Sequence, residues 1–254
     1  MHPQAGELGG DLAAETAVGA RDQGDRLRLP GGGAVRPDAY VTDCNIKPID
    51  AATPPPPATT RVRQVRRTRA NTIAAVRRQL IDGGYHQLSL ERVAVDAGTT
   101  RMTIYRQFGT KLGLLEAVAD DLADRADVAA RVEGAASIAD APAAFVALIG
   151  ESCRFWGTDP ALLRRLVSLA AVDPEAGSLI ANRERWRYQH LAQITGRLAV
   201  ERRISAQFTE PHAVATIAAV TCFPTCDELA TRLSIEHASL TPLIRKLLAS
   251  VIVA

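Results

Sequence analysis

The side chains best suited to binding chemistry lie in residues 89–111, which read SLERVAVDAGTTRMTIYRQFGTK. Their apolar spacing predicts two short helices separated by Gly98, which supplies the left-handed residue that a helix end needs. In the second helix Ile104 and Phe108 share one face, and the opposite face carries polar groups such as Arg106. A helix that buries Ile and Phe while it exposes hydroxyl, phenol and guanidinium groups fits a DNA groove, where these groups reach base edges and phosphates.

Nine side chains are the candidates for DNA contact. The first turn of the second helix should meet base edges, and Met102 is placed there to pack on a thymine methyl group. The sequence leaves open whether Arg101 binds a guanine or a phosphate. Tyr105 and Lys111 should hold the phosphate backbone, with Lys111 beside the N-terminal amides of the following helix. The full set comprises Arg67, Ser89, Thr100, Arg101, Met102, Thr103, Tyr105, Arg106 and Lys111.

The net charge of +2 conceals a concentration of basic residues around this segment. Residues 61–111 carry eleven basic and three acidic side chains, whereas residues 1–60 and 112–254 each carry a net charge of −3. Such a basic stretch is typical of a phosphate-binding module. Its start is either a solvated lead-in or an arm against phosphates or in the minor groove, and we favour the arm because it adjoins the predicted reading head. The basic run comprises Arg61, Arg63, Arg66, Arg67 and Arg69.

Residues 66–126 resemble the helix-turn-helix domain of the TetR family of bacterial transcription regulators. The matching elements are the Gly83-Gly84-Tyr85 turn, Ser89-Leu90, Val93-Ala94, Ala97-Gly98, Thr103-Ile104-Tyr105-Arg106, Phe108 and Lys111. Three positions depart from the family pattern. Thr99 replaces an apolar residue, Met102 replaces a small residue or proline, and Gln107 replaces an aromatic residue or histidine. None of these removes a core contact, but Met102 at the groove-facing end is expected to alter which bases are read.

The sequence divides into three parts. Residues 1–60 hold glycine and proline runs without a sustained apolar period, which indicates a disordered extension. Whether the native protein includes this extension stays open. Residues 66–126 form the predicted three-helix DNA-binding head, with the helix-turn-helix motif at about 89–108. Residues 127–254 form a larger helical body for effector binding and dimerisation, so the predicted fold is all-α.

Local signals place the individual helices. The first helix is predicted from about Thr68 to Asp82, and the Ala-rich stretch from Gly134 onward is predicted as a loop. The last helix is nearly all apolar, which favours a dimer interface, with packing into its own body as the alternative. Helix starts are indicated at Asp159-Pro160, Asp173-Pro174, Thr209 and Thr241-Pro242, and a kink or break is indicated at Pro224.

The body is expected to enclose a mostly apolar effector pocket. Aromatic residues make up only 4% of this Ala- and Leu-rich chain, so the large side chains of the body are candidates to line a cavity. Plain core packing is the alternative for each of them. The candidate pocket residues are Phe145, Trp156, Trp186, His190, Cys222 and Phe223, with Leu148, Leu163 and Tyr188 as further lining or anchoring side chains.

Several other classes of function lack sequence support. No run of 18 apolar residues and no secretory signal is present, so we expect no membrane span and a cytoplasmic location. Cys222 and Cys226 could bind metal or respond to oxidation, but without further ligands at a recognised spacing we favour ordinary buried cysteines. We therefore expect no metal, no cofactor and no enzymatic activity.

The resemblance implies a homodimer that binds a double-stranded DNA operator. A small hydrophobic effector is expected to change the spacing of the two heads and release the dimer, so the chain should act as a repressor. Two alternatives stay open: a co-regulator that responds to a protein partner, and an all-α enzyme that carries a DNA-binding head. The effector, the operator and the regulated genes cannot be read from the sequence, nor can activation be separated from repression.

Overall fold

The computed structural model describes residues 60–253, which all lie in the compact unit Pro55–Ala254. Over this range the chain is helical, with one isolated antiparallel bridge between Ile204 and Ile252. The all-α prediction is therefore confirmed. The predicted disordered extension at 1–60 lies outside the described residues except for Thr60.

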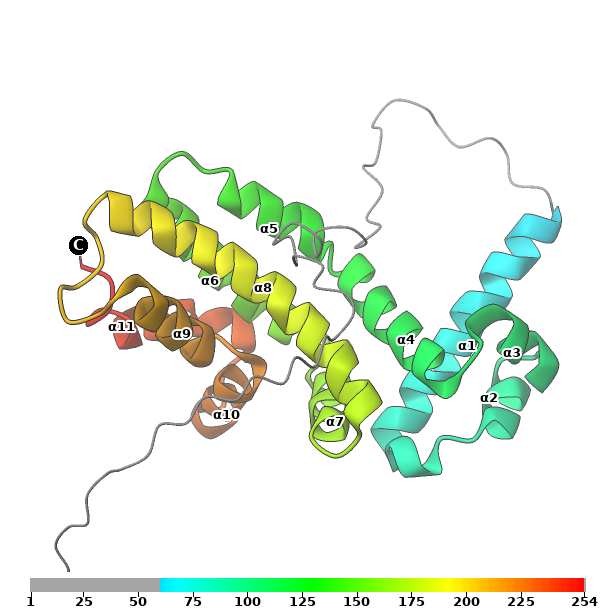
Figure 1. The fold of residues 1–254 in the computed structure, drawn as a ribbon. Coiled ribbons are helices and arrows are strands. Elements are labelled where there is room, and N and C mark those ends of the chain that lie inside the picture. The colour runs from blue at the N-terminus through cyan, green and yellow to red at the C-terminus, as the bar shows by residue number, and fades with distance from the viewer. Residues whose placement is uncertain (1–59, 254) are drawn as a thin grey trace, which may run out of the picture. The chain divides into compact units, whose positions relative to one another are not determined.

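The N-terminal helices form the head that the sequence predicts. Figure 1 shows α2 and α3 beside α1, with α4 leading from them to the helices of the body. The helix α4 contacts both α1 of the head and α8 of the body, so it connects the two regions. The elements are α1 (Thr60–Gly83), the 3-10 turn η1 (Tyr85–Gln87), α2 (Leu90–Asp96), α3 (Arg101–Phe108) and α4 (Lys111–Arg125).

The helix α1 starts at Thr60, eight residues before the predicted start at Thr68. Arginine is a good helix former, and no proline interrupts the chain between Thr60 and Gly83, so the basic run extends the helix. The five arginines therefore belong to the first turns of α1. Their role as an arm against the phosphates or in the minor groove stays a prediction, with the side chains carried by a regular helix.

Hydroxyl caps and left-handed glycines define the helix-turn-helix. Ser89 and Thr100 have extended backbone, and their side chains accept hydrogen bonds from Arg92 N and Thr103 N. Each cap satisfies an amide that has no partner within its helix. Gly98 lies between the two helices with a φ of 62°, a conformation that costs glycine little. These features confirm the predicted helix boundaries.

The body contains seven α-helices, and their starts follow the predicted caps closely. Asp159 and Asp173 accept hydrogen bonds from Leu162 N and Ala176 N, and a proline occupies the first turn in each case. The elements are α5 (Val128–Ala136), α6 (Ala141–Trp156), α7 (Pro160–Ala170), α8 (Pro174–Val200), α9 (Glu210–Val220), α10 (Phe223–Leu233), the 3-10 turn η2 (His237–Leu240) and α11 (Thr241–Leu247).

Two expectations about the body compare differently with the structure. The loop predicted from Gly134 onward is correct only in part: residues 134–136 belong to α5, which buries Val132 and Ala135, and the non-helical connection to α6 covers residues 137–140. The last helix packs into its own body through one face, because α11 contacts α6 and both Ile244 and Leu248 are almost completely buried. Leu247 on the same helix is 48% exposed, and the dimer interface stays a prediction.

The break at Pro224 separates α9 from α10, which meet at a bend of 45°. Over the described residues no single helix is long and apolar enough to cross a membrane. Only α9 and α10 taken together reach the required length and composition, and they do so as a bent pair.

Candidate DNA-binding surface and effector region

The reading helix α3 is attached to the head through one face and exposes the other. Ile104 is 2% exposed and lies in the core, and Phe108 is half-buried beside it. On the opposite side Met102 is 75% exposed and Arg106 is also exposed. The sequence predicted this division from the helical repeat alone, and it leaves the first turn of α3 accessible for contact.

Arg101 is held by two neighbours at the start of α3. Its guanidinium donates to Glu91 Oε1 at 2.5 Å and to the Tyr105 hydroxyl at 3.1 Å, and it lies 5.4 Å from the centre of the Tyr105 ring. Glu91 Oε2 accepts a second hydrogen bond from the Ser89 hydroxyl at 3.1 Å. The four side chains form one network, which we call the Glu91–Arg101 network, and it joins the first turns of α2 and α3.

The charges of this network stabilise one another. The Glu91 backbone amide, the Ser89 hydroxyl and the charge of Arg101 together lower the pKa of the Glu91 carboxyl, so this group stays ionised at neutral pH. The Tyr105 hydroxyl and the Glu91 carboxylate raise the pKa of Arg101. An exposed negative charge therefore lies among the candidate DNA contacts.

Several of the predicted contact residues line a surface hollow of about 400 Å3. Ser89, Glu91, Arg101, Tyr105 and Lys111 contribute to its lining. Because hydroxyl, phenol, guanidinium and ammonium groups converge there, the hollow has the donor chemistry that a DNA phosphate needs.

The remaining predicted contacts lie around this hollow. Thr100 is committed to capping α3 and also contacts the Thr103 hydroxyl at 3.0 Å. Arg67 is exposed on α1, and two residues further along Arg69 packs its guanidinium 4.8 Å from the centre of the Phe108 ring. The basic face of α1 is thus joined to the end of α3.

Sequence reasoning missed two residues of the head. It passed over Glu91, although an acidic residue two positions after a cap is a visible signal for the first turn of a helix. It also passed over Gln79, which is 5% exposed, donates to Asp96 Oδ2 at 3.1 Å and accepts from Ser89 N at 3.2 Å. Gln79 therefore braces α1 against both ends of α2.

Polar contacts join the head to the body. Arg77 on α1 forms an ion pair with Asp159, the capping residue of α7, and this hydrogen bond raises the pKa of Arg77. Arg165 on α7 donates two hydrogen bonds to Ile81 O near the end of α1, at 2.9 and 3.2 Å. Since the last carbonyls of a helix lack partners, Arg165 satisfies one of them. The helix α7 is therefore attached to α1 by two separate contacts.

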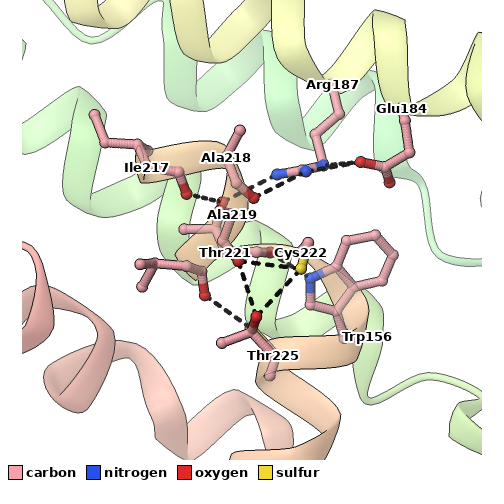
Figure 2. A network of polar contacts seen from close by, with 11 residues as sticks. Trp156, Glu184, Arg187, Ile217, Ala218, Ala219, Thr221, Cys222 and Thr225 are labelled. Atoms are coloured by element: carbon pink, nitrogen blue, oxygen red, sulfur yellow. Dashed lines mark hydrogen bonds and ion pairs between the residues drawn. The ribbon is translucent and has the colours of Figure 1, made fainter. Parts of the chain in front are cut away.

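Several of the predicted pocket residues meet where α6, α9 and α10 converge. Trp156 and Phe223 are buried, with ring centres 5.6 Å apart, and Trp156 Nε1 donates to Thr221 O at 2.9 Å. Cys222 lies next to them and donates from its thiol to Ala219 O at 3.1 Å. Figure 2 shows this junction from close by.

Arg187 on α8 reaches the same junction. Its side chain is 13% exposed, it pairs with Glu184 Oε2 at 2.7 Å, and it donates to Thr221 Oγ1 and Ala218 O at 3.0 and 3.2 Å (Figure 2). A cation is favourable at the C-terminal end of a helix, where the carbonyl groups are unsatisfied. Arg187 therefore connects α8 to the end of α9.

The other candidate pocket residues lie apart from this junction. Trp186 and His190 pack against each other on α8 with ring centres 4.3 Å apart, and His190 Nδ1 is 2.9 Å from Trp186 O. Phe145 is buried about three turns before Trp156 on α6. The candidates thus form two aromatic groups and one separate side chain, and their role in binding an effector stays a prediction.

The cysteines of the body lie mainly in its interior. Cys226 is fully buried, and contact with Cys153 together with burial raises the pKa of its thiol, which keeps it protonated and unreactive. Cys222 is half-buried. Among residues 60–253 no group of three or more His, Cys, Asp or Glu side chains is arranged to hold a metal ion.

Comparisons with known proteins agree with this geometry. Residues 73–118 match the family described as "Bacterial regulatory proteins, tetR family". No curated protein matches the sequence.

Solved structures share the fold. A TetR transcription regulator from Haloarcula marismortui ATCC 43049 is 17% identical with a TM-score of 0.59, over 73% of this chain and 98% of that one. The regulator FadR from Bacillus subtilis, in complex with stearoyl-CoA, is 18% identical with a TM-score of 0.59, over 71% and 97%. A transcriptional regulator from Saccharomonospora viridis, in complex with choline, is 17% identical with a TM-score of 0.57, over 73% and 97%.

A TetR-type helix-turn-helix domain therefore lies at residues 73–118, and the described chain shares the fold of TetR regulators of known structure. The family match runs from α1 into α4 and includes every predicted DNA contact except Arg67. The likeness of the TetR-type body rests on its fold, because the identities are only 17 to 18%. Its ligand chemistry must therefore be argued from its own side chains.

Proposed function

We propose that this protein is a transcription regulator that binds a double-stranded DNA operator as a homodimer and acts as a repressor. The observation that carries the proposal is the division of α3, which buries Ile104 and presents Arg101, Met102 and Arg106 to solvent. The N-terminal turn of such a helix reads base edges in the major groove. In a dimer, two reading helices about 34 Å apart meet successive major grooves.

Phosphate contacts fix the head on the duplex in this proposal. Lys111 is the first residue of α4, so its ammonium group and the N-terminal amides of that helix favour the same anion. Ser89 and Tyr105 supply hydroxyl groups from the same hollow, and Arg67 adds a contact from α1. The first turn of α3, from Thr100 to Thr103, then reads the bases.

The body is proposed to bind a small hydrophobic or amphipathic effector that releases the operator. The aromatic junction of Trp156 and Phe223 supplies apolar surface, and Cys222 and His190 supply polar groups nearby or on the adjoining helix. Neighbours of the same fold are described with ligands as different as stearoyl-CoA and choline, so the fold leaves the effector class open. We favour an apolar ligand because aromatic side chains dominate the candidate set, and we propose no catalytic step and a cytoplasmic location.

A gel-shift titration with Lys111→Ala tests the DNA-binding proposal. The operator is first selected from a randomised duplex pool with the wild-type protein. The variant should bind all sequences more weakly by a similar factor, and the slope of log K against log salt should fall by about one unit. A changed sequence preference at an unchanged slope would contradict the phosphate assignment.

Thermal-shift screening tests the effector proposal. Hydrophobic or amphipathic compounds should raise the melting temperature and release bound operator, because a ligand that binds the folded state stabilises it. Stabilisation by highly charged ligands alone would overturn the apolar pocket. Operator binding that responds to a protein partner and to no small molecule would favour the co-regulator, and an absence of DNA binding would favour an enzyme.

A further inference from the structure

Glu91 is an acidic side chain placed among the predicted DNA contacts. It lies in the first turn of α2, its side chain is 63% exposed, and it lines the same hollow as Tyr105 and Lys111. Any DNA backbone that approaches these groups also approaches the Glu91 carboxylate. By its charge alone Glu91 lowers the affinity for DNA, so its presence among these contacts indicates another purpose.

The contacts of Glu91 indicate that purpose. Its Oε1 accepts from Arg101 at 2.5 Å, and its Oε2 accepts from Ser89 at 3.1 Å, so both oxygens are engaged. A carboxylate and a phosphate offer a guanidinium the same kind of paired oxygen acceptors. Glu91 therefore occupies the place at Arg101 that a DNA phosphate would otherwise take.

Reading a base makes a different demand on Arg101. A guanidinium has five N–H donors in a planar fork, and here Nη1 donates to Glu91 while Nη2 donates to the Tyr105 hydroxyl. Donors that remain can reach the two acceptors of a guanine in the major groove without loss of the Glu91 contact. A phosphate, in contrast, approaches as a second anion and must displace Glu91.

We propose that Glu91 is a specificity-determining residue that withholds Arg101 from DNA phosphates and positions it for a base edge. The proposal rests on the DNA-binding function proposed above. Its consequence is a selective penalty on non-operator DNA, where Arg101 could add only a phosphate contact. Glu91 acts on the DNA through Arg101 and makes no contact of its own in this proposal, so it is a positioning residue.

The variant Glu91→Gln tests this role, because glutamine keeps the shape and removes the charge. Freed from the ion pair, Arg101 should neutralise one more phosphate on random-sequence duplex, which steepens the slope of log K against log salt by about 0.9. Between 1 M and 0.1 M salt, the additional slope of about 0.9 amounts to a gain in non-operator affinity, relative to wild type, of up to roughly eightfold at 0.1 M. Operator affinity should rise less, so the ratio of operator to random affinity should fall.

Two further variants separate this role from a general effect of charge. Glu133→Gln makes the same chemical change at an exposed position on α5 of the body and should leave both affinities and both slopes unchanged. In an Arg101→Gln background, Glu91→Gln should no longer steepen the slope, because the side chain through which Glu91 acts is absent. Persistence of the full effect in that background would overturn the proposal.

The outcomes distinguish this proposal from the DNA-binding function itself. A wild-type protein that retards neither operator nor random duplex overturns the function and the role of Glu91 together. A wild-type protein that retards its operator, while Glu91→Gln leaves the affinity ratio unchanged or raises both affinities equally, overturns only the role of Glu91. A carbon-13 NMR titration without DNA gives a separate readout, since the pKa of Glu91 should rise in Arg101→Gln and stays unchanged if the ion pair does not form in solution.

Discussion

Replacing Asp159 with alanine should remove two interactions at once. The Asp159 carboxylate caps α7 through Leu162 N at 3.2 Å and forms an ion pair with Arg77 on α1. Its side chain is 6% exposed, whereas that of Arg77 is 36% exposed. The same carboxylate therefore stabilises one helix and joins it to another.

The expected loss follows from these two parts. A helix cap contributes about 1 kcal/mol. A hydrogen bond to a charged group contributes about 1.5–3 kcal/mol, and the lower end applies because Arg77 can return partly to water. The free energy of unfolding should thus fall by about 2.5 kcal/mol in Asp159→Ala. In Asp159→Asn, which keeps an oxygen for the cap, it should fall by about 1.5 kcal/mol.

Urea unfolding followed by circular dichroism measures these losses. Asp173→Ala is the matched control, since Asp173 caps α8 through Ala176 N at 2.9 Å, and it should cost only about 1 kcal/mol. A double-mutant cycle with Arg77→Met isolates the ion pair. If Asp159→Ala cost no more than Asp173→Ala and the cycle showed no coupling, the reasoning about the head–body contact would be refuted.

Three further substitutions address the core. Ile104→Ala should destabilise the protein by about 2–5 kcal/mol and weaken operator binding, because it removes the buried anchor of α3. Thermal unfolding measures the stability and a gel shift measures the operator binding, and an unchanged stability would contradict the packing of Ile104. Trp156→Phe should cost about 1–3 kcal/mol in urea unfolding by leaving Thr221 O without its indole donor, and a loss below this range would show that the bond contributes little. Gln107→Met should stabilise the protein by about 1 kcal/mol in urea unfolding, since Gln107 Oε1 is buried without a hydrogen-bond partner among the described residues. Destabilisation by this substitution would instead reveal a partner such as ordered water.

Local sequence signals predicted the helix-turn-helix well. Ser89, Gly98 and Thr100 act within three or four residues of their own positions, as caps or as a left-handed turn, so their effect is visible without the rest of the fold. The burial of Ile104 and the exposure of Met102 follow from the helical repeat. The same logic located the starts of the body helices, where a capping side chain and a proline adjoin.

Other features depended on how the helices pack together. The sequence showed that Glu91 and Arg101 are charged, but only the angle between α2 and α3 brings them to 2.5 Å. Likewise Asp159 reads as a cap, and its pairing with Arg77, 82 positions earlier, arises from the packing of α7 on α1. The composition of the last helix also could not show that one of its faces packs on α6.

The sequence by itself therefore determined the head and its reading face, because caps, glycine turns and helical repeats act over one or two turns. The tertiary structure decided which partner each long side chain meets, because that depends on the relative placement of helices far apart in the chain. This distinction explains why the exposed and buried residues of α3 could be predicted from the sequence. The meeting of Trp156, Phe223 and Arg187 at one junction could not be predicted in the same way. It also places the control of Arg101 in the packing of α2 against α3, a contact that no local pattern encodes.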